Sequence, residues 1–250
     1  MQKAIITTSW DDGVFSDIKL SKLLIKYNIP STFYISKNNK NKKNLSKKQI
    51  IDLSNNFDIG CHTLNHVYLP DIDLDIAKYE IVESKKLLEE LIGKKISSFC
   101  YPRGGYNSDI INILKKAGFK GARTIKILEK NEFDSFKMGV TVHVCGGSYS
   151  HLRAILKHSK INALKNIKPI IYLLKNKAFS KNWIDVSKVY IKYVQRNGGI
   201  FHLWGHSWNI EDKNEWENLE MILKILSKLK KKENVVFMNN SELIKKFGVG

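Results

Sequence analysis

The sequence contains little cysteine. Three of its 250 residues are cysteines, Cys61, Cys100 and Cys145, which are too few and too scattered for a disulfide framework. Their odd number also favours a reducing compartment over an oxidising one.

Long apolar runs and a secretion signal are also missing. No window approaches the roughly 18 consecutive apolar residues that a membrane-spanning helix needs, and the longest candidate, 167–174, is interrupted by Lys168. Residues 1–10 show neither an apolar signal region nor a small-residue cleavage site, and they are typical of a first strand. We therefore expect a soluble, cytoplasmic protein.

Acidic residues are few relative to basic ones. Forty-two Lys and Arg residues against 24 Asp and Glu residues give a net charge of +18. Such an excess of positive charge can favour binding to nucleic acid, to an anionic membrane surface or to an anionic substrate. An AT-rich genome also explains it without any partner, because the lysines accompany many asparagines and isoleucines. The chain shows neither a helix-turn-helix nor a zinc ribbon, which disfavours nucleic acid.

Repeats and linkers rich in proline or glycine are absent, whereas apolar residues make up 43% of the chain. That share is enough for a full core, and the length suits one barrel-sized unit. We therefore expect a single catalytic domain over residues 1–250.

Short apolar runs alternate with amphipathic stretches, a pattern typical of parallel strand–helix units. The predicted strands are Ala4–Ser9, Ser31–Ile35, Phe57–Cys61, Ser97–Tyr101, Gly121–Ile125, Met138–Val144, Gly199–Trp204 and Val235–Met238. The predicted helices include Asp17–Tyr27, Leu74–Leu91, Ser108–Ala117 and Trp216–Leu229. This pattern predicts a distorted (β/α) barrel of seven to eight parallel strands, with an open doubly wound sheet as the alternative.

One stretch, about 145–196, lacks a convincing strand. It contains helical patterns around His151–Ile161, Ile167–Lys175 and Trp183–Gln195. We interpret it as a helical insertion before the last strands and not as a separate domain.

Two carboxylates follow the first strand. Asp11 and Asp12 precede Gly13 at its carboxyl end, the edge where barrels place catalytic groups. One carboxylate can bind a metal while its neighbour accepts a proton from water. Taken by itself, the pair is better explained by an ordinary Asp-Gly turn with a helix cap.

Two histidines follow the third strand. His62 and His66 are four residues apart, close enough to bind one divalent ion. A pair of packing or capping histidines is the alternative. The glutamate of a zinc-protease helix is missing between them, which disfavours that class.

Two further segments carry candidate groups at strand ends. The glycine-rich loop 99–107 offers backbone N–H groups for an oxyanion, unless it is an ordinary loop capped by Asn107 or Ser108. The late strand 200–208 brings two histidines and two tryptophans to one rim, where imidazole can protonate an amine and indole can stack on a sugar. Burial in the core explains both tryptophans equally well.

Taken together and in this order, these motifs resemble the NodB-type polysaccharide deacetylases, carbohydrate esterase family four. The resemblance is carried by Trp10-Asp11-Asp12-Gly13, by His62-Thr63-x-x-His66 and by Ile29-Pro30-Ser31-Thr32-Phe33-Tyr34. It covers roughly residues 3–125 and resumes around 199–238.

The resemblance implies a role for each matching residue. Asp12, His62 and His66 would hold one divalent ion, with zinc as the first choice and cobalt, manganese, nickel or iron as alternatives. Asp11 would be the general base, and His206 the acid that protonates the departing amine. His202, deeper in the strand, is the alternative acid. The remaining site residues would bind substrate or its oxyanion: Tyr101, Arg103, Gly104, Trp204 and Trp208.

The chain departs from the family pattern at Cys100. Many members carry at that position an arginine that pairs with the catalytic base, and Arg103 is the candidate replacement here. An Asp-Trp motif of the family has no clear equivalent near Met138–Val144, although His143 lies there.

The substrate that these features predict is an N-acetylated amino sugar. Without a secretion signal, a nucleotide-linked or lipid-linked glycan in surface polysaccharide biosynthesis is the favoured form, and the basic charge suits a diphosphate or an anionic membrane surface. Two alternatives remain: a hydrolase of ureide-type amides on the same barrel, and a basic module that binds glycan or nucleic acid without catalysis.

Overall fold

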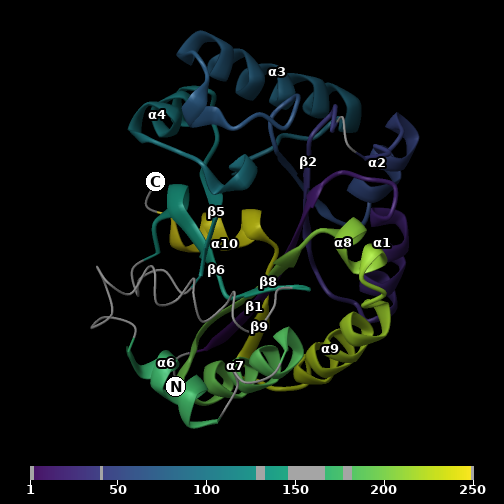
Figure 1. Ribbon diagram of the computed structural model, residues 1–250, viewed down its shortest axis with the longest axis vertical. Coiled ribbons are helices and arrows are strands. Elements are labelled where there is room, and N and C mark those ends of the chain that lie inside the picture. Colours follow the sequence, from purple (N-terminus) through teal and green to yellow (C-terminus); the bar gives the residue numbers. More distant parts are fainter. Residues whose placement is uncertain (1–2, 40–41, 128–132, 146–166, 177–181, 249–250) are drawn as a thin grey trace.

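The computed structural model describes residues 3–39, 42–127, 133–145, 167–176 and 182–248. Its strands form one parallel sheet, which curls into a nearly closed barrel surrounded by helices (Figure 1). The strands are β1 (Ala4–Asp12), β2 (Thr32–Ile35), β3 (Asp58–Cys61), β4 (Ser98–Cys100), β5 (Gly121–Ile127), β6 (Met138–Val140), β7 (Val142–His143), β8 (Gly199–Gly205) and β9 (Val235–Phe237). The predicted (β/α) barrel is therefore confirmed.

The strand order is β6-β5-β4-β3-β2-β1-β8-β7, with β9 also paired to β1. Because β8 pairs with residues 4–10 of β1, the other edge of β1 is shared by β9 at residues 4–6 and β2 at residues 9–12. All pairs are parallel, so the strands end at one rim.

The barrel is closed by the segment predicted as one strand over Met138–Val144. Its first part, β6, pairs with β5, and its second part, β7, pairs with β8. Between them Thr141 bonds to the backbone of His202: its N–H donates to the carbonyl oxygen at 2.9 Å, and its Oγ1 accepts from the N–H at 3.0 Å. This interruption lets one segment bridge two strands that are far apart in the sheet order.

Helices surround the barrel (Figure 1). They are α1 (Asp17–Lys26), α2 (Lys47–Ser54), α3 (Leu74–Ile92), α4 (Ser108–Lys116), α6 (Ile167–Lys175), α7 (Trp183–Asn197), α8 (Ser207–Asp212), α9 (Trp216–Leu229) and α10 (Asn240–Phe247), with 3-10 turns at Leu69–Asp71, Pro102–Gly104 and Ser135–Lys137. Asn107 caps α4, its side chain accepting from the Ile110 N–H at 2.9 Å. The insertion contains α6 and α7, whereas the helix predicted at 151–161 lies outside the described residues.

Helix α10 closes the end of the barrel opposite the rim and was not predicted. Its capping box pairs Asn239 with Glu242, and its first residue, Asn240, is fully buried. The Asn240 backbone N–H donates to Thr32 Oγ1 at 2.8 Å, and its side-chain amide donates to the Tyr34 hydroxyl at 2.9 Å. These bonds occupy the amino end of the barrel and leave the carboxyl end as the open rim.

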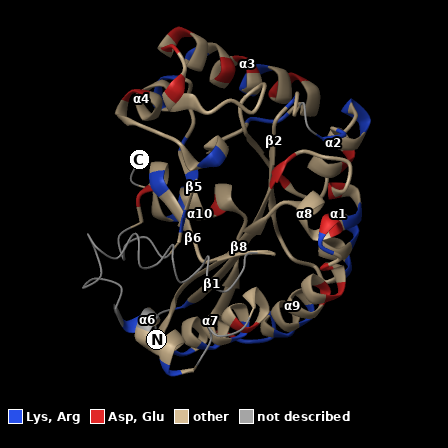
Figure 2. Ribbon diagram, viewed as in Figure 1, with Lys and Arg blue, Asp and Glu red and all other residues tan. Residues whose placement is uncertain are grey.

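The charges of the outer helices bear on the question of partners. Lys and Arg are spread over several helices and alternate with acidic residues (Figure 2). No helix among the described residues is long and apolar enough to cross a bilayer.

Candidate metal centre and active site

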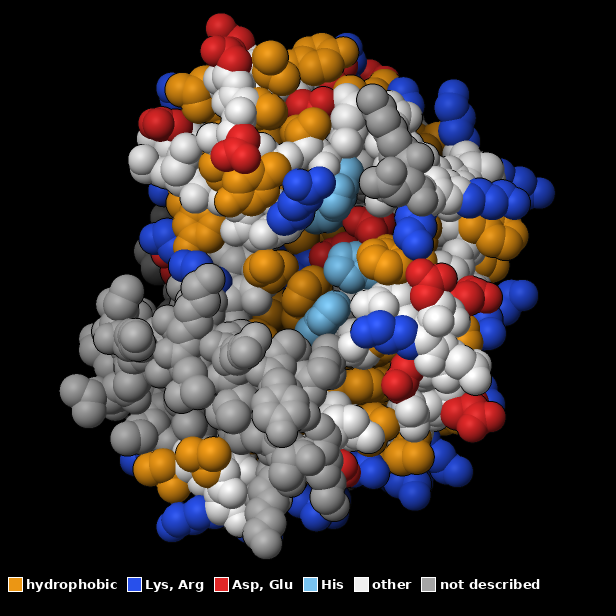
Figure 3. All heavy atoms as spheres, in the orientation of Figure 1, with side chains coloured by type: hydrophobic (Ala, Val, Ile, Leu, Met, Phe, Trp, Pro, Cys, Tyr) orange, Lys and Arg blue, Asp and Glu red, His pale blue; other side chains and the backbone are white. Residues whose placement is uncertain are grey.

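The motifs predicted from the sequence converge at the rim. Asp11 and Asp12 end β1, His62 follows β3, and His206 follows β8. Seen from the open rim, histidine and acidic side chains gather in a hollow near the centre of this face (Figure 3). The parallel sheet thus brings together groups that are up to 195 positions apart in the chain.

Asp12, His62 and His66 form a candidate metal centre. Their ligand atoms lie within 4.8 Å of one another. Asp12 Oδ1 is 3.2 Å from His66 Nε2 and 3.7 Å from His62 Nε2. Asp12 Oδ2 accepts a hydrogen bond from Trp208 Nε1 at 2.7 Å. One carboxylate oxygen is therefore fixed by Trp208, and the other faces two imidazoles.

The donor atoms fit a divalent cation. Asp12 Oδ1 is buried without a hydrogen bond from any described residue. Burial opposes ionisation of Asp12, but the nearby imidazoles outweigh it and lower the pKa of Asp12. Burial lowers the pKa of His62 to about 4, so its ring is neutral. His62 Nδ1 lies 2.8 Å from the Cys100 carbonyl oxygen and donates to it, which leaves the Nε2 lone pair facing Asp12. Two imidazoles and one carboxylate are typical zinc ligands.

A second group of potential ligands is less suitable. Asp11, His62 and Cys100 also lie within reach of one ion. Burial, however, raises the pKa of the Cys100 thiol well above its usual value, and Arg123 already occupies Asp11. Protonated thiols do not ligate metals, so the Asp12 group is the better candidate.

Asp11 is paired with a buried arginine. Arg123 on β5 is fully buried, and its Nη2 donates to both carboxylate oxygens of Asp11. Burial opposes ionisation of Asp11, but the positive charge of Arg123 and the neighbouring imidazoles outweigh it and lower the pKa of Asp11. Asp11 is therefore a carboxylate that is able to accept a proton.

Arg123 was missed by the sequence reasoning, which named Arg103 as the candidate. Arg103 is exposed on the 3-10 turn, whereas Arg123 on β5 is paired in register with Cys100 on the neighbouring strand β4. The Arg123 Nη2 atom is 2.8 Å from Cys100 Sγ. The guanidinium beside Asp11 therefore comes from β5 and not from the position of Cys100 on β4, where the resemblance implied an arginine. An arginine inside a predicted strand was the available signal, because buried arginines need an acidic partner.

The two candidate acids have different environments. His202 is buried, with Nε2 2.8 Å from Ser9 Oγ and Nδ1 3.1 Å from the Gly139 carbonyl oxygen, and burial lowers its pKa to about 3. His206 is partly exposed, and its Nε2 is 4.0 Å from Asp11 Oδ2. This geometry favours His206, since both ring nitrogens of His202 are occupied.

The two tryptophans differ in the same way. Trp204 is buried between the His143 ring, whose centroid is 4.3 Å from its own, and the Arg123 guanidinium at 4.7 Å. Trp208 is partly exposed, and the Lys42 ammonium lies 4.1 Å over its ring. Trp208 is the one that a substrate can reach.

Several polar groups of the loop after β4 already have hydrogen-bond partners within the protein. The Tyr101 ring is buried and its hydroxyl donates to the Phe136 carbonyl at 3.0 Å. The Tyr101 N–H donates to the Arg123 carbonyl at 3.2 Å, and the Gly104 N–H donates to the Tyr101 carbonyl at 2.9 Å. The oxyanion role of this loop stays a prediction.

Asp17 at the start of α1 links two sides of the site. Its Oδ2 accepts from the Val14 N–H at 2.9 Å, and its Oδ1 accepts from Ser207 Oγ at 2.5 Å. Ser207 follows His206 in the chain, so this carboxyl holds the loop after β1 against the loop after β8. Burial raises the pKa of Asp17 to about 8.

We expect Asp17→Asn to change how stability depends on pH. Folded Asp17 keeps a proton up to about pH 8, whereas unfolded Asp releases it near its usual pKa of about 3.9. The free energy of unfolding of the wild type should therefore fall between these values as pH rises, by up to about 1.4 kcal/mol per unit. Urea unfolding from pH 5 to 8 measures it. Asp17→Asn should remove this contribution, and parallel curves for the two proteins would contradict the assignment.

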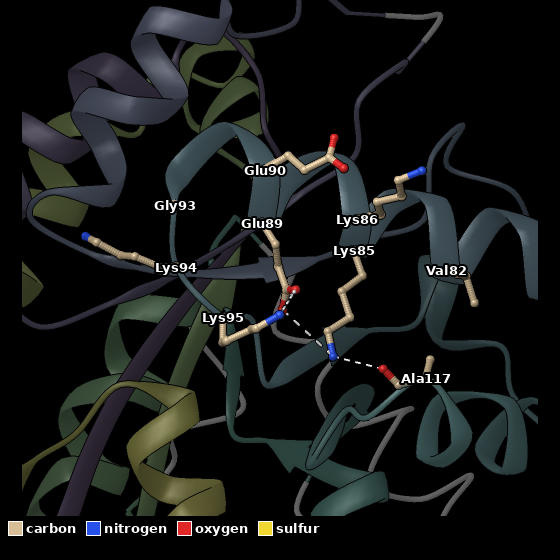
Figure 4. Close-up of a pocket in the computed structure, with 9 residues that line it drawn as sticks. All are labelled: Val82, Lys85, Lys86, Glu89, Glu90, Gly93, Lys94, Lys95 and Ala117. Atoms are coloured by element: carbon tan, nitrogen blue, oxygen red, sulfur yellow. Dashed lines mark hydrogen bonds and ion pairs between the residues drawn. The ribbon is translucent and has the colours of Figure 1, made fainter.

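A separate groove lies along α3, with a volume of about 600 Å³ (Figure 4). Lys85 Nζ donates to the Ala117 carbonyl at 2.9 Å, and Glu89 pairs with Lys85 at 3.9 Å and with Lys95 at 3.2 Å. None of the candidate catalytic residues lines this groove.

The fold and the site define a parallel (β/α)-barrel protein with a candidate metal centre at the carboxyl ends of its strands. The sequence profile of the polysaccharide deacetylase family matches residues 1–122, which confirms the resemblance to these deacetylases over that part of the chain.

Known proteins extend this similarity. The chain is 26% identical over 122 residues to YxkH of Bacillus subtilis, a protein described as a polysaccharide deacetylase, and the match covers 48% of this chain but only 43% of that relative. A Mycobacterium smegmatis protein of the same description superposes with a TM-score of 0.64, at 11% identity, over 98% of this chain and 90% of its own. The Xyl-CE4 domain of a xylanase from the hindgut metagenome of Trinervitermes trinervoides gives 0.54, at 13% identity, over 100% and 93%. At these identities the two structures show the shared fold alone.

Proposed function

We propose that this protein is a metal-dependent hydrolase that removes an N-acetyl group from an amino sugar. The observation that carries the proposal is the convergence of Asp12, His62 and His66 beside the ionised Asp11, with His206 Nε2 4.0 Å from Asp11 Oδ2. The similarity of residues 1–122 to polysaccharide deacetylases supports the same chemistry.

The residues divide the work as follows. Asp12, His62 and His66 hold a divalent ion, for which zinc is the first choice given two imidazoles and a carboxylate. Such an ion acidifies water and polarises a carbonyl group. Asp11, kept ionised by Arg123, takes a proton from the attacking water. His206 donates a proton to the departing amine, which it can do because it is partly exposed and its Nε2 lies 4.0 Å from Asp11 Oδ2.

The sugar binds between the loops at the rim. Trp208 offers a partly exposed ring for the apolar face of a hexosamine, and its N–H also fixes Asp12. Substrate binding at this ring is therefore coupled to the orientation of a metal ligand.

An anionic carrier group on the sugar is the favoured substrate feature. Basic side chains stand beside the hollow (Figure 3). Lys42 lies over Trp208, Lys213 donates to the Cys145 carbonyl at 2.9 Å after β7, and Arg103 is exposed after β4. A diphosphate that links the sugar to a nucleotide or lipid would meet these charges, which fits a step in surface polysaccharide biosynthesis.

Metal removal tests the proposal. We expect the purified protein to bind one divalent ion and to release acetate from at least one member of a panel of N-acetylated sugars and sugar nucleotides. A chelator should abolish this release and zinc should restore it, while His66→Ala should lose both the ion and the activity. Asp71→Ala, which removes an exposed carboxylate, is the matched control. A fully active metal-free protein would rule the proposal out.

Salt tests the anionic carrier. We expect kcat/KM for a nucleotide-linked substrate to fall as ionic strength rises from low to physiological, because exposed charges are then screened. The neutral free sugar should show little change in the same assay. An equal response for the two substrates would count against the carrier group and leave the deacetylation itself untouched.

A further inference from the structure

Glu80 is a buried carboxylate on α3 that the proposed chemistry does not use. Only 4% of its surface is exposed. Its Oε2 accepts hydrogen bonds from the backbone N–H groups of Leu64, at 2.9 Å, and Asn65, at 2.8 Å, and its Oε1 accepts from Asn65 Nδ2 at 2.5 Å. Three N–H donors therefore converge on this one carboxyl group. Through Glu80, helix α3 thus holds the middle of the loop that joins the two candidate histidine ligands.

That loop has a backbone that must be held in place. Thr63 and His66 have φ angles of 61° and 54°, in the left-handed region that residues with a Cβ rarely adopt. Each such residue costs about 1–3 kcal/mol and persists only where its surroundings enforce it. The ligand His66 is itself one of the two strained residues.

The opposite side of the loop is held by the chain that follows β2. The Asn38 N–H donates to the Leu64 carbonyl at 2.9 Å, Ser36 Oγ donates to the same carbonyl at 3.3 Å, and Asn38 Nδ2 donates to Asn65 Oδ1 at 2.9 Å. These bonds restrain the carbonyl side. Glu80 is the group that restrains the N–H side.

We propose that Glu80 is a positioning residue of the metal centre, which holds the loop so that His62 and His66 bind one ion together with Asp12. The inference rests on the proposed function, because it needs a bound ion. Groups that orient metal ligands from the next layer typically contribute about 10–100-fold to metal affinity.

The test is the zinc affinity of the full chain, measured by competition with a chromophoric chelator. Glu80→Ala should weaken zinc binding by about 10–100-fold. Glu80→Gln, which keeps one acceptor oxygen, should recover part of the loss. Glu90→Ala removes an exposed carboxylate from the same helix and should leave the affinity unchanged. The absorption spectrum of bound Co²⁺ should also change in Glu80→Ala, because ligand geometry and not only stability is altered.

The outcomes separate the two proposals. A folded Glu80→Ala protein with wild-type zinc affinity and an unchanged Co²⁺ spectrum would overturn the positioning role alone. If Glu80→Ala does not fold, Glu80→Gln and Asn65→Ala test the positioning role, since each removes only part of the hydrogen bonding between Glu80 and the loop. Wild-type zinc affinity in both variants would overturn that role. A wild-type protein that binds no zinc or cobalt would overturn the proposed function, and this inference with it.

Discussion

Asp11→Asn is expected to lower kcat by about 10²–10⁴-fold, the usual contribution of a general base, while the metal stays bound. The substitution keeps the volume of the side chain but removes its ability to accept a proton. Metal binding should persist, because Asp12, His62 and His66 are unchanged. Acetate release and bound-metal content, measured on the same preparation, check both expectations.

A matched control is Asp109→Asn, an exposed aspartate on α4 that should leave both quantities unchanged. Full activity in Asp11→Asn would show that another group is the base. Loss of the ion would instead identify Asp11 as a ligand and favour the alternative group with His62 and Cys100. Thermal unfolding should accompany the assay, since a neutral amide in place of the Asp11 carboxylate leaves the charge of Arg123 without its partner.

Arg123→Met is expected to lower the free energy of unfolding by about 3–5 kcal/mol at neutral pH, the usual cost of leaving one partner of a buried ion pair alone. The pKa of Asp11 should then rise, because burial is no longer opposed by the guanidinium. The lowered pKa of Asp11 contributes stability above its unfolded pKa, and this is lost as pH falls through the folded pKa. The destabilisation should therefore be largest near neutral pH and smaller in acid.

Urea unfolding at several pH values measures this effect, with Arg103→Met as the matched control. Because Arg103 is exposed, its replacement should change stability by less than about 0.5 kcal/mol. The acidic limb of the pH profile of kcat/KM should also move to higher pH in Arg123→Met. A stable Arg123→Met protein with an unshifted profile would show that the pair does not set the charge of Asp11.

A rescue experiment follows from the register of β4 and β5. Cys100 and Arg123 lie side by side on neighbouring strands, and both approach Asp11. We expect Cys100→Arg combined with Arg123→Ala to recover part of the stability lost in Arg123→Ala alone, because the guanidinium would return from the adjacent strand. Unfolding curves of the single and double variants measure the recovery.

The barrel and much of the site could be predicted because their signals are local. Seven of the eight predicted strands are present as single strands, the one over Met138–Val144 is split into β6 and β7, and Trp216–Leu229 matches α9 in both bounds. The periodicity of a strand or a helix can be recognised from residues close together in the sequence. Parallel strands then bring their carboxyl ends to one rim. Asp11, Asp12, His62 and His206 were therefore expected together, although their catalytic roles, the single-domain organisation and the cytoplasmic location stay predictions.

Only the tertiary structure decided which partners the buried polar and charged groups have. Arg123 meets Asp11 across 112 positions, Glu80 reaches a loop 15 residues before it, and Asn240 of the unpredicted α10 closes the barrel through Thr32 and Tyr34. The choice between His202 and His206 depends in the same way on which ring nitrogens are already bonded. Such pairings depend on strand register and on how helices pack against the barrel. No short pattern of residues encodes either, because each is set by how the whole core packs.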